Sequence, residues 1–247
     1  MKYSRTIYFQ MEMNIELLIG HFKYTWYTEI MVLLLNVVAL KICLNKTEKL
    51  KYFFAVYFSV NIAVLIASWT LVTITSIPNA TKGIVYNYLN SIITVTELLA
   101  YSMFYKNFLK KKYFLYYLQI PFFLLIILEI LFLFTRFSFL TDRYRFIVSL
   151  LNVFEFLILV PPSICYFYEL FNSNNEIGIL SRPSFWIATG IFSFAVISTP
   201  FYLLSPLLWD LKFENRAILG IFLFQLPLIF NLSFLIRGFK CKNPISI

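Results

Sequence analysis

Long apolar blocks separated by short polar segments dominate the chain. A helix needs about 20 apolar residues to cross the roughly 30 Å hydrocarbon core of a bilayer, and these blocks are long enough. A helix also satisfies its backbone hydrogen bonds within one segment, as a bilayer requires. The pattern therefore predicts an all-α polytopic transmembrane bundle of seven helices. The expected spans are about 27–44, 52–77, 83–105, 113–134, 146–167, 184–208 and 217–236.

The segments at the two ends differ from the blocks between them. Residues 1–25 are mixed and polar and lack the pattern of a signal peptide, although Met11 and Met13 offer alternative starts to Met1. Apolar residues of this segment share one helical face, so a short interfacial helix is expected there. Residues 26–242 then form one seven-helix domain, and 243–247 form a tail.

Composition and charge support a membrane location. The 247 residues are 60% hydrophobic and 13% charged, whereas a soluble domain is about 45–50% apolar and about 25% charged. The net charge of +9 comes mostly from Lys and Arg that flank the blocks, so the expected partner is the bilayer surface and not nucleic acid. The clearest basic cluster consists of Lys106, Lys110, Lys111 and Lys112. The distribution of basic residues between the two sides predicts the N-terminus outside and the C-terminus in the cytoplasm.

Few residues offer ordinary enzyme chemistry. His21 is the only histidine, and the three cysteines have no metal-ligand spacing, so neither a metal site nor a cofactor is expected. No nucleophile elbow, phosphate-binding loop or zinc-protease motif occurs, and no catalytic residue is assigned. Asn231 is part of an Asn-x-Ser triplet, a pattern that occurs here at chance frequency. With six glycines and no GxxxG motif in any span, close helix packing through glycine is not expected.

Three carboxylic side chains, Glu97, Glu129 and Glu155, lie well inside predicted spans. A charge there is costly and no Lys or Arg lies at comparable depth, so we expect protonated or hydrogen-bonded carboxyls that face the interior. Two polar stripes at helical spacing accompany them. The stripes are Asn90, Thr94, Glu97 and Tyr101 in the third span, and Ser149, Asn152 and Glu155 in the fifth.

A structural interpretation of these stripes is equally open, because polar side chains also join helices to one another in membranes. That interpretation applies most to Glu129, which has only Leu, Ile and Phe around it in the sequence. In the fifth span, Pro161 and Pro162 predict an interruption and a kink, a common way to open a cavity.

Two segments carry a resemblance to known proteins. One contains Glu97, Tyr101, Phe104, Tyr105 and Lys106, and the other runs from Pro183-Ser184-Phe185-Trp186 to Gly190. In these patterns the chain resembles uncharacterised small seven-helix integral membrane proteins of Bacteroidota. The resemblance implies a stand-alone module in the bacterial inner (plasma) membrane, and it transfers no catalytic residue.

Three functions fit these observations. The first is a non-enzymatic sensory or partner-binding module that binds a small ligand or another membrane or signalling protein, with the basic cluster as its cytoplasmic face. The alternative is a small proton-coupled transporter that uses the midplane carboxyls. The third is an intramembrane lipid-modifying enzyme, which needs Glu97 and Glu155 within reach of one substrate. The sequence does not identify a ligand or substrate.

Overall fold

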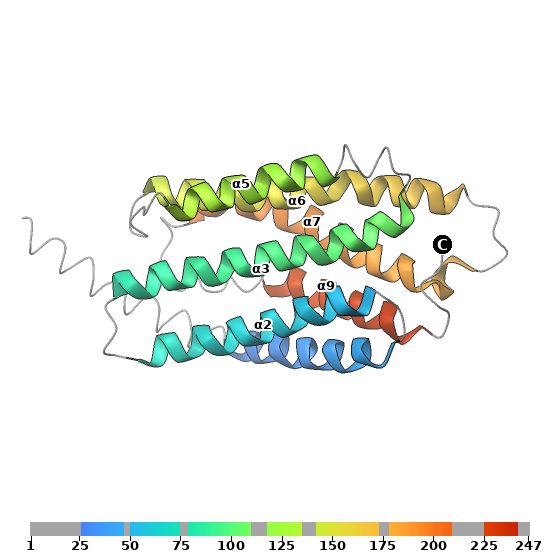
Figure 1. Ribbon diagram of the computed structural model, residues 1–247, viewed down its shortest axis with the longest axis horizontal. Coiled ribbons are helices and arrows are strands. Elements are labelled where there is room, and N and C mark those ends of the chain that lie inside the picture. The colour runs from blue at the N-terminus through green and yellow to red at the C-terminus, as the bar shows by residue number, and fades with distance from the viewer. Residues whose placement is uncertain are drawn as a thin grey trace, which may run out of the picture.

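The computed structural model describes residues 26–46, 50–74, 79–109, 118–134, 142–172, 178–208 and 225–241. Within these ranges the chain forms helices and short turns and contains no β-strand, which confirms the predicted all-α class. The helices lie along one long axis, and successive described helices run in opposite directions (Figure 1). The N-terminal segment 1–25 and the tail 243–247 lie outside the described residues.

The helices differ in length. The first described helix is Trp26–Leu44, and it is followed by α2 (Leu50–Thr73) and α3 (Asn79–Phe108). Next come α5 (Ile120–Phe134) and α6 (Asp142–Phe171). The short 3-10 helix η2 (Ile179–Ser181) precedes α7 (Pro183–Leu208), and the last helix is α9 (Leu226–Lys240).

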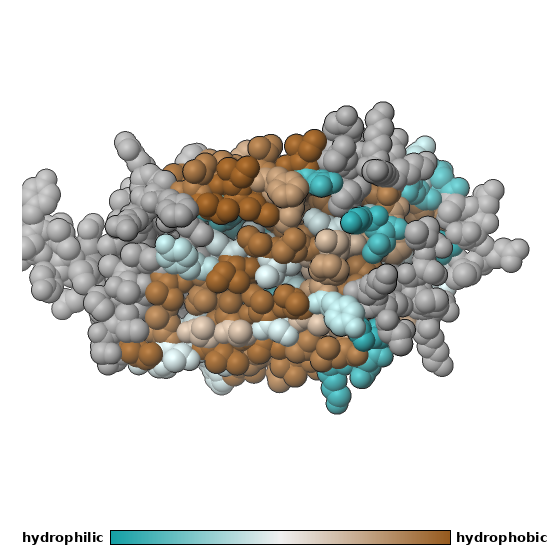
Figure 2. Space-filling view, viewed as in Figure 1, coloured by the Kyte–Doolittle hydropathy of each residue, from teal (hydrophilic) through white to brown (hydrophobic). Residues whose placement is uncertain are grey.

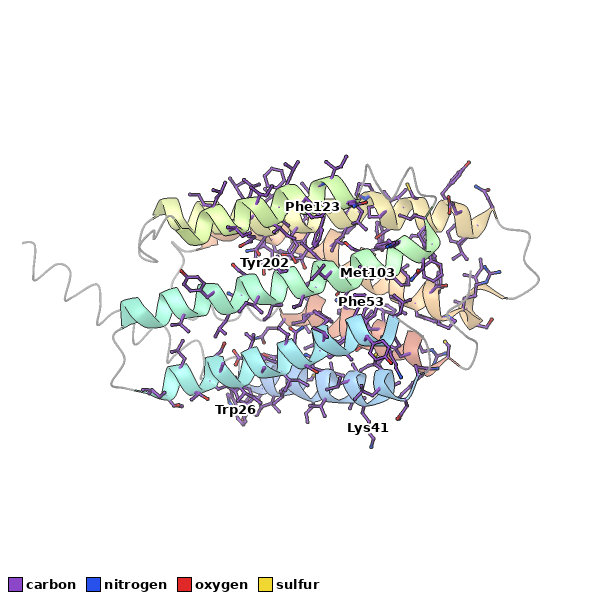
Figure 3. All side chains as sticks on the ribbon, viewed as in Figure 1. Trp26, Lys41, Phe53, Met103, Phe123 and Tyr202 are labelled. Atoms are coloured by element: carbon purple, nitrogen blue, oxygen red, sulfur yellow. The ribbon has the colours of Figure 1, made fainter. Side chains whose placement is uncertain are left out.

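Four helical segments are long and apolar enough to cross a membrane. They are Trp26–Leu44, Leu50–Leu71, Ser149–Phe171 and Pro183–Leu204. Figure 2 shows apolar side chains over much of the described surface, and exposed residues such as Leu34, Ile127 and Leu131 belong to it. Phe123 of α5, labelled in Figure 3, is exposed as well. A surface of this kind suits contact with lipid, so the described bundle has the character of a helical membrane protein.

The predicted interruption at Pro161 and Pro162 is not observed, because α6 continues through both residues. Proline removes the backbone donors that would reach the carbonyls of Leu157 and Ile158, but it leaves the following turns intact. Immediately after the pair, the Ser163 hydroxyl donates a hydrogen bond of 2.7 Å to the Leu159 carbonyl. In a membrane, neighbouring helices and serine hydroxyls make such proline-containing helices tolerable.

Helix packing divides the bundle into two tightly packed groups. Helix α2 packs extensively against α3, while α7 packs extensively against both α6 and α9. Helix α3 contacts α5 and α6 much less extensively. We call this sparser interface, between α3 on one side and α5 and α6 on the other, the seam. Within the core, the rings of Phe54 and Phe239 join α2 to α9 at a centroid distance of 5.2 Å.

Two glycines bring α7 and α9 close together, contrary to the expectation from the sequence. A Cβ atom on Gly190 of α7 would lie 2.9 Å from Phe234 Cβ, and one on Gly238 of α9 would lie 2.9 Å from the Pro183 carbonyl oxygen. Each helix needs only one glycine at the point of contact. A repeated glycine motif is therefore not required, and the sequence shows none.

One end of the bundle carries most of the described basic residues, while Lys82, Arg143 and Arg145 are in the first turns of α3 and α6, at the other end (Figure 1). In Figure 1 the end with most basic residues contains the last turns of α3 and α9 and the first turns of α2 and α7, and Lys41 lies toward it in Figure 3. The Lys46 ammonium donates a hydrogen bond of 2.8 Å to the Cys241 carbonyl, which ties the chain after the first helix to the end of α9. The basic residues at this end are Lys41, Lys46, Lys51, Lys106, Arg182, Arg237 and Lys240.

Candidate functional site

The candidate site is a set of three buried carboxyls on three helices at the seam. Glu97 of α3 is 5% exposed, Glu155 of α6 is 4% exposed and Glu129 of α5 is 7% exposed. The carboxyl of Glu155 lies close enough to both Glu97 and Glu129 to interact with them electrostatically. Tertiary packing thus brings together residues that are distant in the chain: Glu97 and Glu129 are 32 positions apart, and Glu129 and Glu155 are 26 positions apart.

Helix α3 supplies hydroxyl groups to two of the carboxyls. The Thr94 hydroxyl donates a hydrogen bond of 3.3 Å to Glu155 Oε2. One turn earlier, the Ser91 hydroxyl donates a hydrogen bond of 2.8 Å to Glu129 Oε2. Glu129 is therefore part of the polar interior, although the sequence around it gave no such indication. Ser91, which makes this contact, lies outside the predicted stripe.

Glu97 lies among tyrosines. Its carboxyl interacts with the hydroxyls of Tyr57 from α2 and Tyr101 from the next turn of α3. These contacts are looser than those of the other two carboxyls, since neither Glu97 Oε1 nor the Tyr57 hydroxyl makes a hydrogen bond of standard geometry in the described structure. Both tyrosine rings are fully buried and lie 5.8 Å apart between centroids.

Asn231 of α9 extends this polar set to a fourth element. Its side-chain Nδ2 donates a hydrogen bond of 2.7 Å to the Tyr101 hydroxyl, and the residue is fully buried. In the sequence, Asn231 is prominent only as part of an Asn-x-Ser triplet. The available signal was an amide in the middle of the apolar run LPLIFNLSFLI, where an unpaired polar group would be costly.

The fifth-span stripe is found on α6 next to α7. Ser149 is buried, and its hydroxyl donates a hydrogen bond to the Tyr202 carbonyl of α7. Asn152 is half-buried, one turn before Glu155. The stripe therefore contacts two different helices. Ser149 bonds to α7, whereas Glu155 accepts a hydrogen bond from Thr94 of α3.

Asn90 is not part of the buried face of α3, contrary to the prediction. It is exposed, whereas Thr94 is half-buried and Glu97 and Tyr101 are buried. Helical spacing places these four residues on one side of α3, but the neighbouring helices decide which levels of that side are covered. Ser91, the next residue, makes the contact to α5.

Of the predicted basic cluster, the structure describes Lys106, which is exposed near the end of α3. Lys110, Lys111 and Lys112 lie outside the described residues. At the same end of the bundle, the Arg237 guanidinium lies over the Trp186 ring at 5.3 Å, which links α9 to α7.

The chemistry of the site is that of buried acids among neutral donors. In the described part of the chain, the groups that interact most strongly with the three carboxyls are hydroxyls and other carboxyls, with no Lys or Arg among them. The described residues also contain no group of three or more His, Cys, Asp or Glu side chains arranged to hold a metal ion. The site can hold protons, and it brings Glu97 and Glu155 near each other, as a paired-carboxyl enzyme would also require.

Comparison of the chain with protein-family models, with curated proteins and with solved structures finds no match in any of the three.

Proposed function

We propose that this protein is a non-enzymatic membrane carrier that couples movement of a solute to proton binding at Glu97, Glu129 and Glu155. The observation that supports this function best is the burial of three carboxyls from three helices against one face of α3, where Ser91 bonds to Glu129 and Thr94 bonds to Glu155. Neighbouring carboxylates repel each other strongly where the dielectric constant is low. Loss of more than one proton therefore creates a force between the helices that carry them.

The position of the cluster supports coupling to a conformational change. The carboxyls lie at the seam, where α3 meets α5 and α6 less extensively than α2 meets α3 or α7 meets α6 and α9. Repulsion between Glu97 and Glu155 acts across this interface and would separate α3 from α6. Rocking of one packed group against another is a common basis of alternating access in carriers.

For the whole chain we propose seven spans, with the N-terminus outside and the C-terminus in the cytoplasm of a bacterial inner membrane. The four described segments that are long and apolar enough to cross a membrane support part of this topology. The alternating helix directions support repeated crossing, and the excess of described basic residues at the end that includes the last turn of α9 supports the orientation (Figure 1).

Solute uptake into proteoliposomes tests the carrier function. Radiolabelled amino acids, sugars and amines are supplied with and without an imposed pH gradient. We expect at least one solute class to accumulate with the gradient, and Glu97→Gln to remove the pH-driven part. Glu29→Gln makes the same chemical change at a carboxyl that bonds Trp69 instead, so it should leave uptake unchanged. The proposal would be contradicted if uptake were the same with and without the pH gradient and the same in the wild type and in Glu97→Gln.

A second candidate is the sensory or partner-binding module, and the contacts at the basic end favour it. The Lys46–Cys241 hydrogen bond and the Arg237–Trp186 contact connect helix ends there. A shift at the seam could thus reach the basic end and a signalling partner. This candidate predicts that replacing Lys110, Lys111 and Lys112 abolishes association with a partner protein, and unchanged co-purification would count against it.

A further inference from the structure

Two buried oxygens of the Glu97 site lack the hydrogen bonds that their neighbours make. Glu97 Oε1 and the Tyr57 hydroxyl are unpaired in the described structure, and both residues are more than nine-tenths buried. By contrast, Glu129 and Glu155 each accept a hydroxyl hydrogen bond. Buried polar atoms without partners are uncommon in native structures and call for an explanation.

A proton on Glu97 supplies one donor and leaves other lone pairs of these oxygens without a partner. A protonated Oε1 would be a donor that needs an acceptor at hydrogen-bonding geometry, and none is in place. The Tyr101 hydroxyl accepts the hydrogen bond from Asn231 and keeps its own proton, which it can donate to Glu97. These donors leave lone pairs on the Glu97 carboxylate and on the two hydroxyl oxygens, and such lone pairs are what a bound cation requires.

An oxygen-coordinated cation would satisfy both atoms together. Carboxylate and hydroxyl oxygens are ligands that hard cations prefer. One carboxylate balances one positive charge, which matters because an unbalanced charge is costly in the interior of a membrane protein. The described residues offer no group of three acidic, histidine or cysteine ligands that would suit a more highly charged metal ion.

We propose that Glu97, Tyr57 and Tyr101 form a binding site for one Na⁺ ion. The ion binds the Glu97 carboxylate and the two hydroxyl oxygens as Glu97 releases its proton, so one positive charge enters and one leaves. The proposal rests on the carrier function, because it makes Na⁺ the ion that is exchanged for protons there.

The groups that surround the site from other helices are consistent with this exchange. Tyr57 comes from α2 and Asn231 comes from α9, and neither adds a positive charge. Glu155 comes from α6 and interacts with Glu97, and Glu129 of α5 interacts with Glu155. A cation at Glu97 is therefore attracted by every ionised carboxyl nearby and competes with protons for the cluster.

Binding of radioactive Na⁺ to the purified full chain in lipid nanodiscs tests the site, with choline chloride holding the ionic strength constant. We expect saturable binding that weakens at acidic pH, with one proton released for each Na⁺ bound. Glu97→Gln should abolish binding. Tyr57→Phe, which removes only a hydroxyl, should weaken affinity about tenfold. Tyr166→Phe removes another buried, unpaired hydroxyl, away from Glu97, and should bind Na⁺ as the wild type does.

Absence of saturable Na⁺ binding by the wild type would overturn the proposal, as would unchanged binding by Glu97→Gln. If Glu97→Gln does not fold, Tyr57→Phe decides, and wild-type affinity in that variant overturns the proposal. Solute uptake driven by a pH gradient in choline medium distinguishes failure of the Na⁺ site from failure of the carrier function. Intact uptake without Na⁺ binding removes only the Na⁺ site, whereas loss of both removes the carrier function too.

Discussion

The side-chain amide of Asn231 donates a hydrogen bond of 2.7 Å to the hydroxyl of Tyr101, which joins α9 to α3 across 130 positions of the chain. The same Tyr101 hydroxyl interacts with the Glu97 carboxyl one turn earlier on α3. Asn231 in turn lies against Gly190, where a Cβ atom would come within 3.1 Å of its Oδ1. One polar contact thus connects the carboxyl site to the α7–α9 interface.

Tyr101→Phe removes the acceptor for the Asn231 amide and should destabilise the protein by about 1 kcal/mol. A double-mutant cycle with Asn231→Leu measures the interaction between the two side chains in thermal unfolding. We expect a coupling of about 0.6 kcal/mol and at most about 1.7 kcal/mol, the average and the maximum found for polar contacts between membrane helices. Strictly additive effects of the two substitutions would mean that the contact does not stabilise the fold.

Gly190→Ala and Gly238→Ala should each destabilise the α7–α9 interface by about 1–3 kcal/mol, because the added methyl group meets tightly packed atoms. For Gly238 the obstacle includes a backbone carbonyl, which cannot rotate away. Gly178→Ala is the control, since its Cβ would meet nothing within 4 Å. Melting temperatures in detergent measure all three variants, and equal temperatures for Gly178→Ala and Gly238→Ala would contradict this packing.

Tyr105→Phe should release α6 from α3 just beyond the two prolines. The Tyr105 hydroxyl and Ser163 Oγ lie 2.5 Å apart, and Ser163 donates to the Leu159 carbonyl, so Tyr105 is the donor between the two hydroxyls. Loss of one buried hydrogen bond costs about 1 kcal/mol. Hydrogen exchange by mass spectrometry should show faster exchange in the α6 segment that follows Pro162. Exchange confined to other segments would show that the bond does not hold α6 there.

The three interior carboxyls should be visible as protonated acids. Infrared difference spectra between acidic and alkaline conditions are expected to contain carbonyl bands of carboxylic acids that shift in D₂O. Glu97→Gln, Glu129→Gln and Glu155→Gln should each remove part of this signal, because each residue is buried next to neutral donors or other acids. If none of the three substitutions alters the spectrum, the cluster keeps one protonation state. The carrier function would then lose its basis.

The sequence by itself determined the helical class and the apolar character of the spans. Sixty per cent hydrophobic residues in long blocks leave a helix in a bilayer as the structure that satisfies the backbone. It also determined that Glu97 and Glu155 would be buried, since a carboxyl in the middle of an apolar helix is driven toward other polar groups. These are properties of single helices, so one segment at a time was enough to infer them.

Tertiary structure decided which side chains meet. Helical periodicity places Asn90 and Glu97 on one side of α3, but the neighbouring helices cover Glu97 and leave Asn90 exposed. The same neighbours bring Ser91 to Glu129 and Asn231 to Tyr101. Such pairs depend on the order and rotation of helices in the bundle, which no local pattern encodes. Contacts between distant segments therefore had to come from the folded chain.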